Sequence, residues 1–200
     1  MNRAEFRSLF SNWLNRTDLD DATANLVINR ALARCQRELR IPSMEKSIRI
    51  TPGPSGSITG LELPDDLLTI VNMEADGHIL DAVSYPQLLQ AHRTGRPKWF
   101  ARDQDRLLIR PAAKSYARLV FVGEFLPLNA DTDTNALLDV SPECFLFACL
   151  SYAGDLYKMA ETQQWDQRYQ AERDTLNGMA DEVNLLSGLA HVQSAYGYDC

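Results

Sequence analysis

The chain has 200 residues, of which 45% are hydrophobic and 24% are charged, so it can fold around a core and disorder over its whole length is excluded. Its formal net charge of −7 argues against a protein that reads DNA sequence through a basic face. Solubility is the simplest explanation of this acidic balance, although a surface that nucleic acid passes without sticking is compatible with it as well.

The N-terminal segment lacks the apolar region of a signal peptide, and no apolar run approaches the ~20 residues that a membrane span needs. The four cysteines are Cys35, Cys144, Cys149 and Cys200, and none of them forms a CxxC pair or has a histidine close in sequence. We therefore expect reduced thiols in a cytoplasmic setting, with the first three acting as small hydrophobic side chains.

Two amphipathic helices are predicted at the N-terminal end. The first spans residues 3–15, and Asp18 or Asp20 then offers an N-cap to the second. The second helix runs to about Arg40, because Pro42 disfavours helix in the residue before it. Apolar residues recur at spacings of three and four and form one stripe on each helix. The stripes consist of Phe6, Leu9, Phe10, Trp13 and Leu14, and of Ala24, Ile28, Ala31, Cys35 and Leu39.

The middle of the chain, about residues 45–125, is predicted to be rich in strands. Ile48 and Ile50 alternate with polar residues, which marks the change from a helical period to a period of two. Strands are expected at residues 46–51, 58–63, 70–73, 78–80, 99–102, 106–109 and 117–122.

Turn signals separate these strands. The Asp-Gly pair at residues 76–77 favours a two-residue hairpin turn, and residues 103–105 form the tip of another hairpin. A short helix is expected at residues 84–91, closed by Gly95. Residues 119–122 are apolar on both faces, so we expect this strand to lie centrally in its sheet.

Two further helices are predicted near the C-terminal end, after a polar and acidic stretch at residues 127–139. Ser141 can cap the first helix, with Pro142 at its first position. The apolar spacing fails between the two helices, which predicts a break at residues 160–163. The expected seams are Phe145, Cys149, Tyr152, Leu156 and Met159, and then Trp165, Tyr169, Glu172, Leu176, Met179, Val183 and Leu186.

No motif in the sequence predicts catalysis or cofactor binding: there is no P-loop, no GxSxG and no GxGxxG. The histidines, among them His78, lie far apart in the sequence, so we expect no metal site and no enzyme. Asp131 and Asp133, in the segment DTDTN, could bind a cation. A solvated loop is the simpler interpretation, because the segment lacks the glycine and the distal glutamate of an EF-hand.

The basic residues gather in two places. Arg30, Arg34, Arg37 and Arg40 recur along the second helix, either as a solvated face or as a docking face for an acidic partner. The choice of arginine in all four positions favours an interface, and the two interpretations stay open. The second group, at residues 93–98, is expected to be an exposed loop.

Five segments occur in a fixed order along the chain. They are RELRIPSME at residues 37–45, ELPDDLL at 62–68, GRPKWFARDQDRLLIRPAA at 95–113, the run from ARLVFVGEFLPL to SYAGDLY at 117–157, and QWDQRYQAERDTL at 164–176. In order and spacing this set resembles the head-to-tail adaptor (connector) proteins of tailed bacteriophages, over residues 3–186. The chain departs from the family pattern at residues 123–125, where Gly-Glu-Phe fills the usual tyrosine-like aromatic position. It also departs at residues 136–138, where Ala-Leu-Leu replaces Trp-Leu-Leu.

The resemblance implies an α+β fold, in which N- and C-terminal helices form a bundle and an antiparallel β module is inserted between them in the chain. The expected parts are helices at residues 1–44, the β module at 45–126, a linker and helices at 127–186, and a flexible tail at 187–200. The implied function is that of a structural virion protein without cofactors and without a membrane partner. Such adaptors form a ring, generally of twelve subunits, that docks on the portal and carries the tail or a nozzle protein.

The same resemblance implies where the protein acts: it is made in the host cytoplasm and is located in the virion, at the junction of capsid and tail. DNA passes through the ring during packaging and ejection. Two alternatives remain: a tail-completion or gatekeeper protein of the same neck, and a soluble α+β enzyme with Asp131, Asp133 and His78 as its candidate residues.

The last fourteen residues, 187–200, generate a prediction of their own. We expect them to become ordered on a partner, through Tyr196 and Tyr198, because ordering costs ~1–2 kcal/mol per residue that buried area must offset. Deleting residues 187–200 should weaken binding to the portal, measured as the dissociation constant of the complex. An unchanged constant would refute this role.

Overall fold

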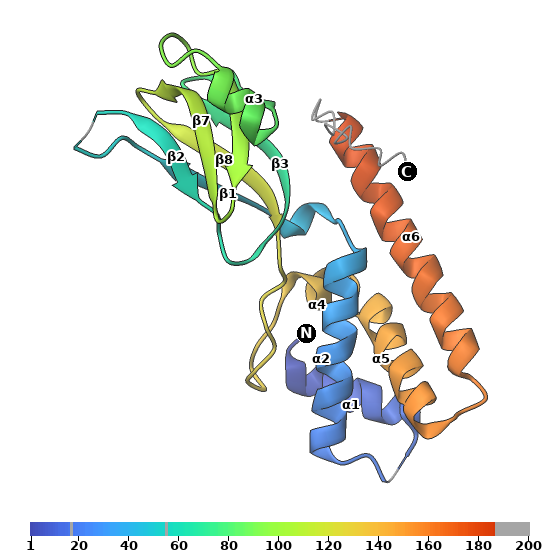
Figure 1. The fold of residues 1–200 in the computed structure, drawn as a ribbon. Coiled ribbons are helices and arrows are strands. Elements are labelled where there is room, and N and C mark those ends of the chain that lie inside the picture. Colours follow the sequence, from blue (N-terminus) through green and yellow to red (C-terminus); the bar gives the residue numbers. More distant parts are fainter. Residues whose placement is uncertain (17, 55, 187–200) are drawn as a thin grey trace. The chain divides into compact units, whose positions relative to one another are not determined.

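The computed structural model describes residues 1–16, 18–54 and 56–186, with side chains described as far as Ala180. The chain divides into two compact units (Figure 1). The helical unit consists of Met1–Met44 together with the described chain from Phe125 onward, and the β unit consists of Glu45–Glu124. The α+β fold class is therefore confirmed, with helices from both ends of the chain and strands between them.

The helical unit begins with two helices whose first turns are capped by side chains, and the cap of the second is one that the sequence predicts. In α1 (Arg3–Leu14), the Asn2 side chain accepts from the Glu5 amide at 2.9 Å and the Glu5 carboxylate accepts from the Asn2 amide at 3.0 Å. Asp20 caps α2 (Asp21–Glu38) by accepting from the Thr23 amide at 2.6 Å. The other candidate cap, Asp18, forms an ion pair with Arg16 instead. A short 3-10 turn, η1 (Pro42–Met44), ends this part.

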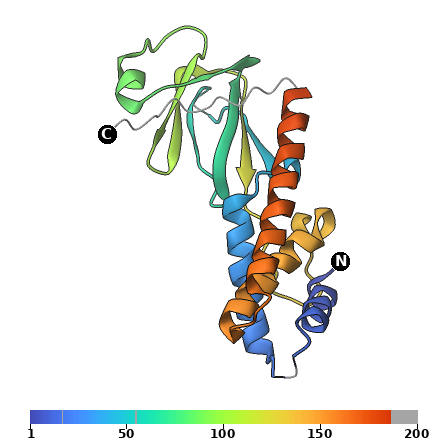
Figure 2. The same ribbon diagram turned by 90° about the vertical axis from the view of Figure 1, so that its right-hand side faces the viewer.

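The centre of the helical unit is α5 (Pro142–Tyr157), which begins at the predicted cap Ser141. It contacts α1, α2, α4 (Ala136–Val140) and α6 (Thr162–Leu186). In Figure 1, α5 lies between α2 and α6, and Figure 2 shows α1 (dark blue) nearly end-on beside them. The ring of Phe145 stacks on Phe6 with centroids 4.5 Å apart.

The predicted seam of α5 is too narrow, because this helix is buried on most sides. Its buried residues are Cys144, Phe145, Leu146, Phe147, Ala148, Cys149, Leu150, Ser151, Ala153 and Gly154. Leu156, which we predicted to be part of the seam, is 54% exposed. A helix surrounded by four others buries more than one stripe, and spacing alone does not reveal its neighbours.

The predicted break between the last two helices is confirmed. Helix α5 ends at Tyr157, Lys158 adopts a left-handed conformation, and α6 begins at Thr162. In α6, Trp165 and Tyr169 are buried as predicted, whereas Met179 is 59% exposed and its position in the seam was wrong. The side chains of Val183 and Leu186 lie outside the described part.

A short helix, α4, occupies part of the stretch that we predicted as a polar linker. The side chain of Asn135 caps it by accepting from the Leu138 amide at 3.1 Å. Leu137 and Leu138 are buried in the helical unit. Five residues are too few to show a helical period, so this helix depends on tertiary contacts.

The β unit contains two four-stranded sheets, with the orders β1-β8-β3-β4 and β2-β7-β6-β5. Residues from both sheets share one core that includes Met73, Leu107, Ile109, Leu119 and Phe121. The strands are β1 (Glu45–Ile50), β2 (Ile58–Glu62), β3 (Leu67–Ala75), β4 (His78–Ile79), β5 (Asp81–Ala82), β6 (Trp99–Asp103), β7 (Arg106–Ala113) and β8 (Ala117–Gly123).

The first and last strands of the β unit are hydrogen-bonded neighbours. Strands β1 and β8 run antiparallel, with Glu45 opposite Val122. The chain therefore enters and leaves the β unit at adjacent points, as an inserted module requires. Strand β8 lies between β1 and β3, which confirms its predicted central place.

Most predicted turns of the β unit are confirmed. Asp76 and Gly77, both at positive φ, join β3 to β4, and Gln104 at φ 53° forms the tip between β6 and β7. One pair departs from the expected antiparallel pattern, because β5 runs parallel to β6. The connection between them carries α3 (Tyr85–Gln90), a crossover that a parallel pair needs. This helix ends before Gly95, which therefore does not close it.

None of the helices within the described ranges combines the length and the apolarity that crossing a membrane requires.

The contact between α5 and α6 can be tested with two helical glycines. A Cβ on Gly154 would lie 2.5 Å from Thr162 Oγ1 and 3.0 Å from Trp165 Cζ3, so Gly154→Ala should lower the free energy of unfolding by about 1–3 kcal/mol. A Cβ on Gly178 meets nothing within 4 Å, so Gly178→Ala should raise it by about 0.5–1 kcal/mol. Urea unfolding measures both, and equal effects would contradict the packing described.

Candidate interaction surfaces

The structure separates the four arginines that the sequence groups on one helix. Arg30, Arg34 and Arg37 lie in α2, whereas the helix ends at Glu38 and Arg40 lies beyond it. Arg30 and Arg37 are exposed, whereas only 16% of the Arg34 side chain is accessible. Arg40 is half-buried and donates from Nη1 to the carbonyl oxygens of Gln36 at 3.0 Å and Leu39 at 2.5 Å, at the C-terminal end of α2. Two of the four therefore bind groups within the helical unit.

Arg34 links α2 to α6. Its Nη1 donates to Asp166 Oδ1 at 2.7 Å and its Nε donates to Glu38 Oε1 at 3.1 Å. The guanidinium also lies over the ring of Tyr169, 4.1 Å from the centroid. Burial alone lowers the pKa of Arg34, but the hydrogen bonds to Asp166 and Glu38 outweigh it and raise the pKa, so this cation stays charged.

Glu38 extends this network along α6. Its second oxygen, Oε2, accepts from Arg173 Nη1 at 3.1 Å. Burial alone raises the pKa of Glu38, but the hydrogen bonds from Arg173 and Arg34 outweigh it, so the pKa lies below its ordinary value. One turn further, Asn177 accepts from the Arg40 amide and donates to the Glu38 carbonyl, both at 2.9 Å. The contact of α2 with α6 therefore includes a network of charged and amide hydrogen bonds.

Arg30 and Arg37 are the two arginines of α2 with exposed side chains. Neither forms an ion pair with any residue in the described ranges, so both are accessible to an acidic partner. The docking face proposed for Arg30, Arg34, Arg37 and Arg40 stays a prediction, with these two as its accessible part. Tyr196 and Tyr198 lie outside the described residues.

The aspartates of the segment DTDTN form hydrogen bonds within the helical unit. Asp131 Oδ1 accepts from Arg3 Nη1 at 3.2 Å, and Asp133 Oδ2 accepts from the amides of Ala130 at 2.7 Å and Asn129 at 2.8 Å. These two hydrogen bonds from backbone amides lower the pKa of Asp133. Arg3, which is nearly buried, also donates to Asn25 Oδ1 at 2.7 Å. The two aspartates thus hold the loop to the start of α1.

Three buried cysteines, Cys35, Cys144 and Cys149, are free thiols in the core of the helical unit, as the sequence predicts. A hydrogen bond with Cys144 and burial raise the pKa of the Cys35 thiol, and burial raises that of Cys149. The thiols of Cys35 and Cys149 therefore stay protonated. Throughout the described ranges, no three histidine, cysteine or acidic side chains gather as metal ligands would.

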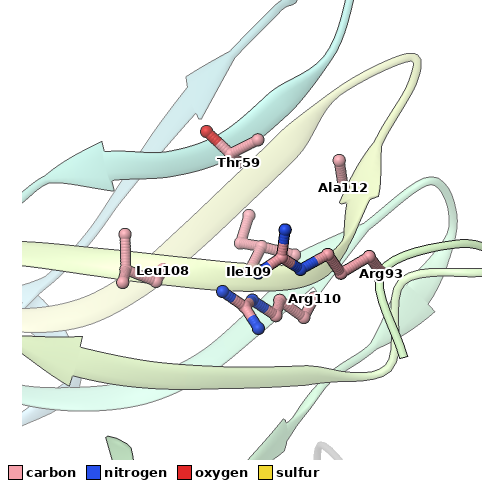
Figure 3. Close-up of a pocket in the computed structure, with 6 residues that line it drawn as sticks. All are labelled: Thr59, Arg93, Leu108, Ile109, Arg110 and Ala112. Carbon is pink, nitrogen blue, oxygen red and sulfur yellow. The ribbon is translucent and has the colours of Figure 1, made fainter. Parts of the chain in front are cut away.

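The β unit has a basic hollow that the sequence did not single out. It has a volume of about 290 Å³ and is lined by Thr59, Arg93, Leu108, Ile109, Arg110 and Ala112 (Figure 3). We call it the arginine hollow. The alternation of Arg106, Leu108, Arg110 and Ala112 along β7 was the available signal, because it places these residues on one face.

The model of the SU10 adaptor protein family matches residues 1–190, which covers almost the whole chain. None of the curated proteins matches the chain significantly.

Arg34 should carry more stability than its neighbours on α2. Arg34→Met removes both charged hydrogen bonds and leaves Asp166 without its cation, so the free energy of unfolding should fall by about 1.5–3 kcal/mol. Arg37→Met, at an exposed position on the same helix, should change it by no more than about 0.5 kcal/mol. Denaturant titration compares the two variants, and equal losses would show that Arg34 is only a surface residue.

The lowered pKa of Glu38 predicts an acid dependence. The stability that Glu38 contributes is complete above its unfolded pKa of about 4.5 and is lost as the pH falls through its lower folded value. The free energy of unfolding should therefore fall less steeply below about pH 4.5 in Glu38→Gln than in the unmodified chain. Urea titrations at several acidic pH values measure the slope, and parallel slopes would exclude this contribution.

Proposed function

The chain belongs to the SU10 adaptor protein family, a family of phage head-to-tail adaptors, and from this membership we propose that its subunits form a ring that docks on the portal. As a member it is a virion-associated adaptor protein. We infer further that the ring bridges capsid and tail at the neck of the particle, holds the tail or a nozzle protein, and lets DNA pass through its lumen.

The observation that carries this proposal is the extent of the family match. It spans residues 1–190 and so includes the helical unit, the inserted β unit and both connections between them. A match confined to one unit would leave room for a shared module in an unrelated protein. A match over both units supports a common architecture and, with it, a common role.

The surface chemistry is compatible with a DNA channel. Outside Glu45–Glu124, the chain carries ten basic and seventeen acidic residues. Glu45–Glu124 itself carries ten of each. An acidic surface does not retain phosphates, so DNA can move past it. A ring of about twelve subunits, as the family resemblance implies, stays part of the proposal.

The structure favours a structural role over the enzyme alternative. Asp131 and Asp133 are engaged in holding a loop to α1, and His78 belongs to the other unit. We therefore propose no catalytic role for these three residues. The chain's function would reside in extended surfaces of both units.

The proposal can be tested with the portal protein encoded in the same genome. Electron microscopy of the mixture should show a ring of this chain stacked coaxially on the portal. The chain alone serves as the control, because assembly on a template does not require the free subunit to form rings. A chain that never associates with the portal would contradict the proposal.

Cross-linking in intact particles distinguishes the adaptor from a tail-completion or gatekeeper protein. The adaptor should cross-link directly to the portal, because it occupies the next layer of the neck. Cross-links to tail proteins alone would favour the gatekeeper.

A further inference from the structure

The arginine hollow lies on the face of its sheet that points away from the core of the β unit. Along β7, Leu107 and Ile109 are buried in that core, whereas Leu108 and Arg110 alternate with them and are half-buried. The neighbouring β2 has a bulge at Thr59, where the register with β7 shifts. The hollow thus has an aliphatic floor, a hydroxyl at one side and two guanidinium groups.

The two guanidinium groups have no anionic partner. Arg93 and Arg110 extend into the same part of the hollow (Figure 3), and none of the residues that line it is acidic. In the described ranges of the β unit, the ion pair that forms is Lys46 with Asp66, which involves neither arginine. Two cations that share a partly enclosed space repel each other, and an anion placed between them removes this cost.

Arg110 is held in position for such an anion. Its Nη1 donates to the carbonyl oxygens of Leu89 at 3.0 Å and Leu88 at 3.2 Å, at the end of α3. These bonds fix the guanidinium while Nε and Nη2 have no acceptor among the described residues. A fixed guanidinium edge matches the two oxygens of a carboxylate. Lys114 lies on an adjoining hollow that shares Arg93 and Ala112, so the positive charge continues beyond the site.

We propose that the arginine hollow receives a carboxylate side chain from a second copy of the chain, as part of the contact between neighbours in the ring. This inference rests on the proposed ring. Head-to-tail contacts in a ring join two different surfaces of identical subunits, so one surface must complement the other. The basic surface lies within residues 93–114, which contain seven basic and two acidic residues. The segments of the helical unit, with their excess of acidic residues, supply the complement.

A DNA phosphate is the competing occupant, and the structure favours it less. The hollow is concave with an aliphatic floor, a shape that admits a single side chain more readily than a convex duplex. Unpaired arginines that faced a DNA channel would also retain phosphates and hinder passage. We therefore place the hollow at the contact between subunits.

Charge reversal tests the proposal on the assembled complex. Arg93→Glu should weaken the association of neighbouring subunits on the portal on the order of 100-fold. The new carboxylate would face the carboxylate of the neighbouring subunit, and the two negative charges would repel each other. Arg93 forms no ion pair with a described residue, so the variant should fold. Arg118→Glu is the matched control: it changes the charge equally at an exposed position of β8. Native mass spectrometry counts the copies bound per portal as the concentration rises.

This experiment distinguishes the role of the hollow from the formation of the ring. Assembly lost in Arg93→Glu and kept in Arg118→Glu supports the hollow as a subunit contact. Wild-type rings with unchanged assembly of Arg93→Glu would overturn the inference and leave the ring intact. Equal loss in both variants would also overturn it, as a general charge effect. If the wild type forms no ring on the portal, the proposed function and this inference both fail.

Zero-length cross-linking identifies the occupant directly. Arg93→Lys supplies an amine at this position, which a carbodiimide joins to a contacting carboxylate. Rings mixed from ¹⁴N- and ¹⁵N-labelled subunits should yield a peptide pair that joins position 93 of one copy to an acidic residue of another. Position 93 joined only within one copy would overturn the inference. Fluorescence anisotropy with a labelled DNA duplex tests the competing occupant. If Arg93→Glu abolishes duplex binding and leaves ring assembly unchanged, the hollow binds DNA and the inference is overturned.

Discussion

The burial of α5 is the constraint on which the helical unit depends. This helix is buried on most sides, and the elements that cover it come from both ends of the chain: α1 and α2 precede the β unit, whereas α4 and α6 follow it. Neither end alone can remove so much apolar surface from water. The two segments must therefore fold together, and the β unit must be an insertion whose ends return to adjacent points.

Two kinds of contact, apolar and charged, stabilise the helical unit. The contacts of α5 are apolar and include the stacked rings of Phe6 and Phe145. The contact of α2 with α6 relies on Arg34, Glu38 and their partners, which are charged and directional. Apolar burial supplies most of the free energy, and the charged network fixes how α6 lies along α2.

The sequence predicts local features well because their causes lie within a few residues. Asp20 and Ser141 cap their helices, and Asp76 and Gln104 take positive φ in turns, as their neighbours dictate. It fails where distant contacts decide the outcome. Helix α4 is too short to show a helical period. The apolar spacing of α5 predicts one buried stripe, whereas contacts with four other helices bury most of its surface. The site follows the same rule: Arg34 resembles Arg30 and Arg37 in spacing, and only the fold brings it to Asp166. The arginine hollow likewise needs the pairing of β2 with β7.

We propose that this chain forms the layer of the neck next to the portal. Cryo-electron microscopy of the neck in intact particles tests it most directly, with the helical unit and the β unit fitted as separate bodies. We expect a closed ring of this chain between portal and tail, with every subunit touching the portal and both neighbours. A portal whose next layer is built from another protein would contradict it.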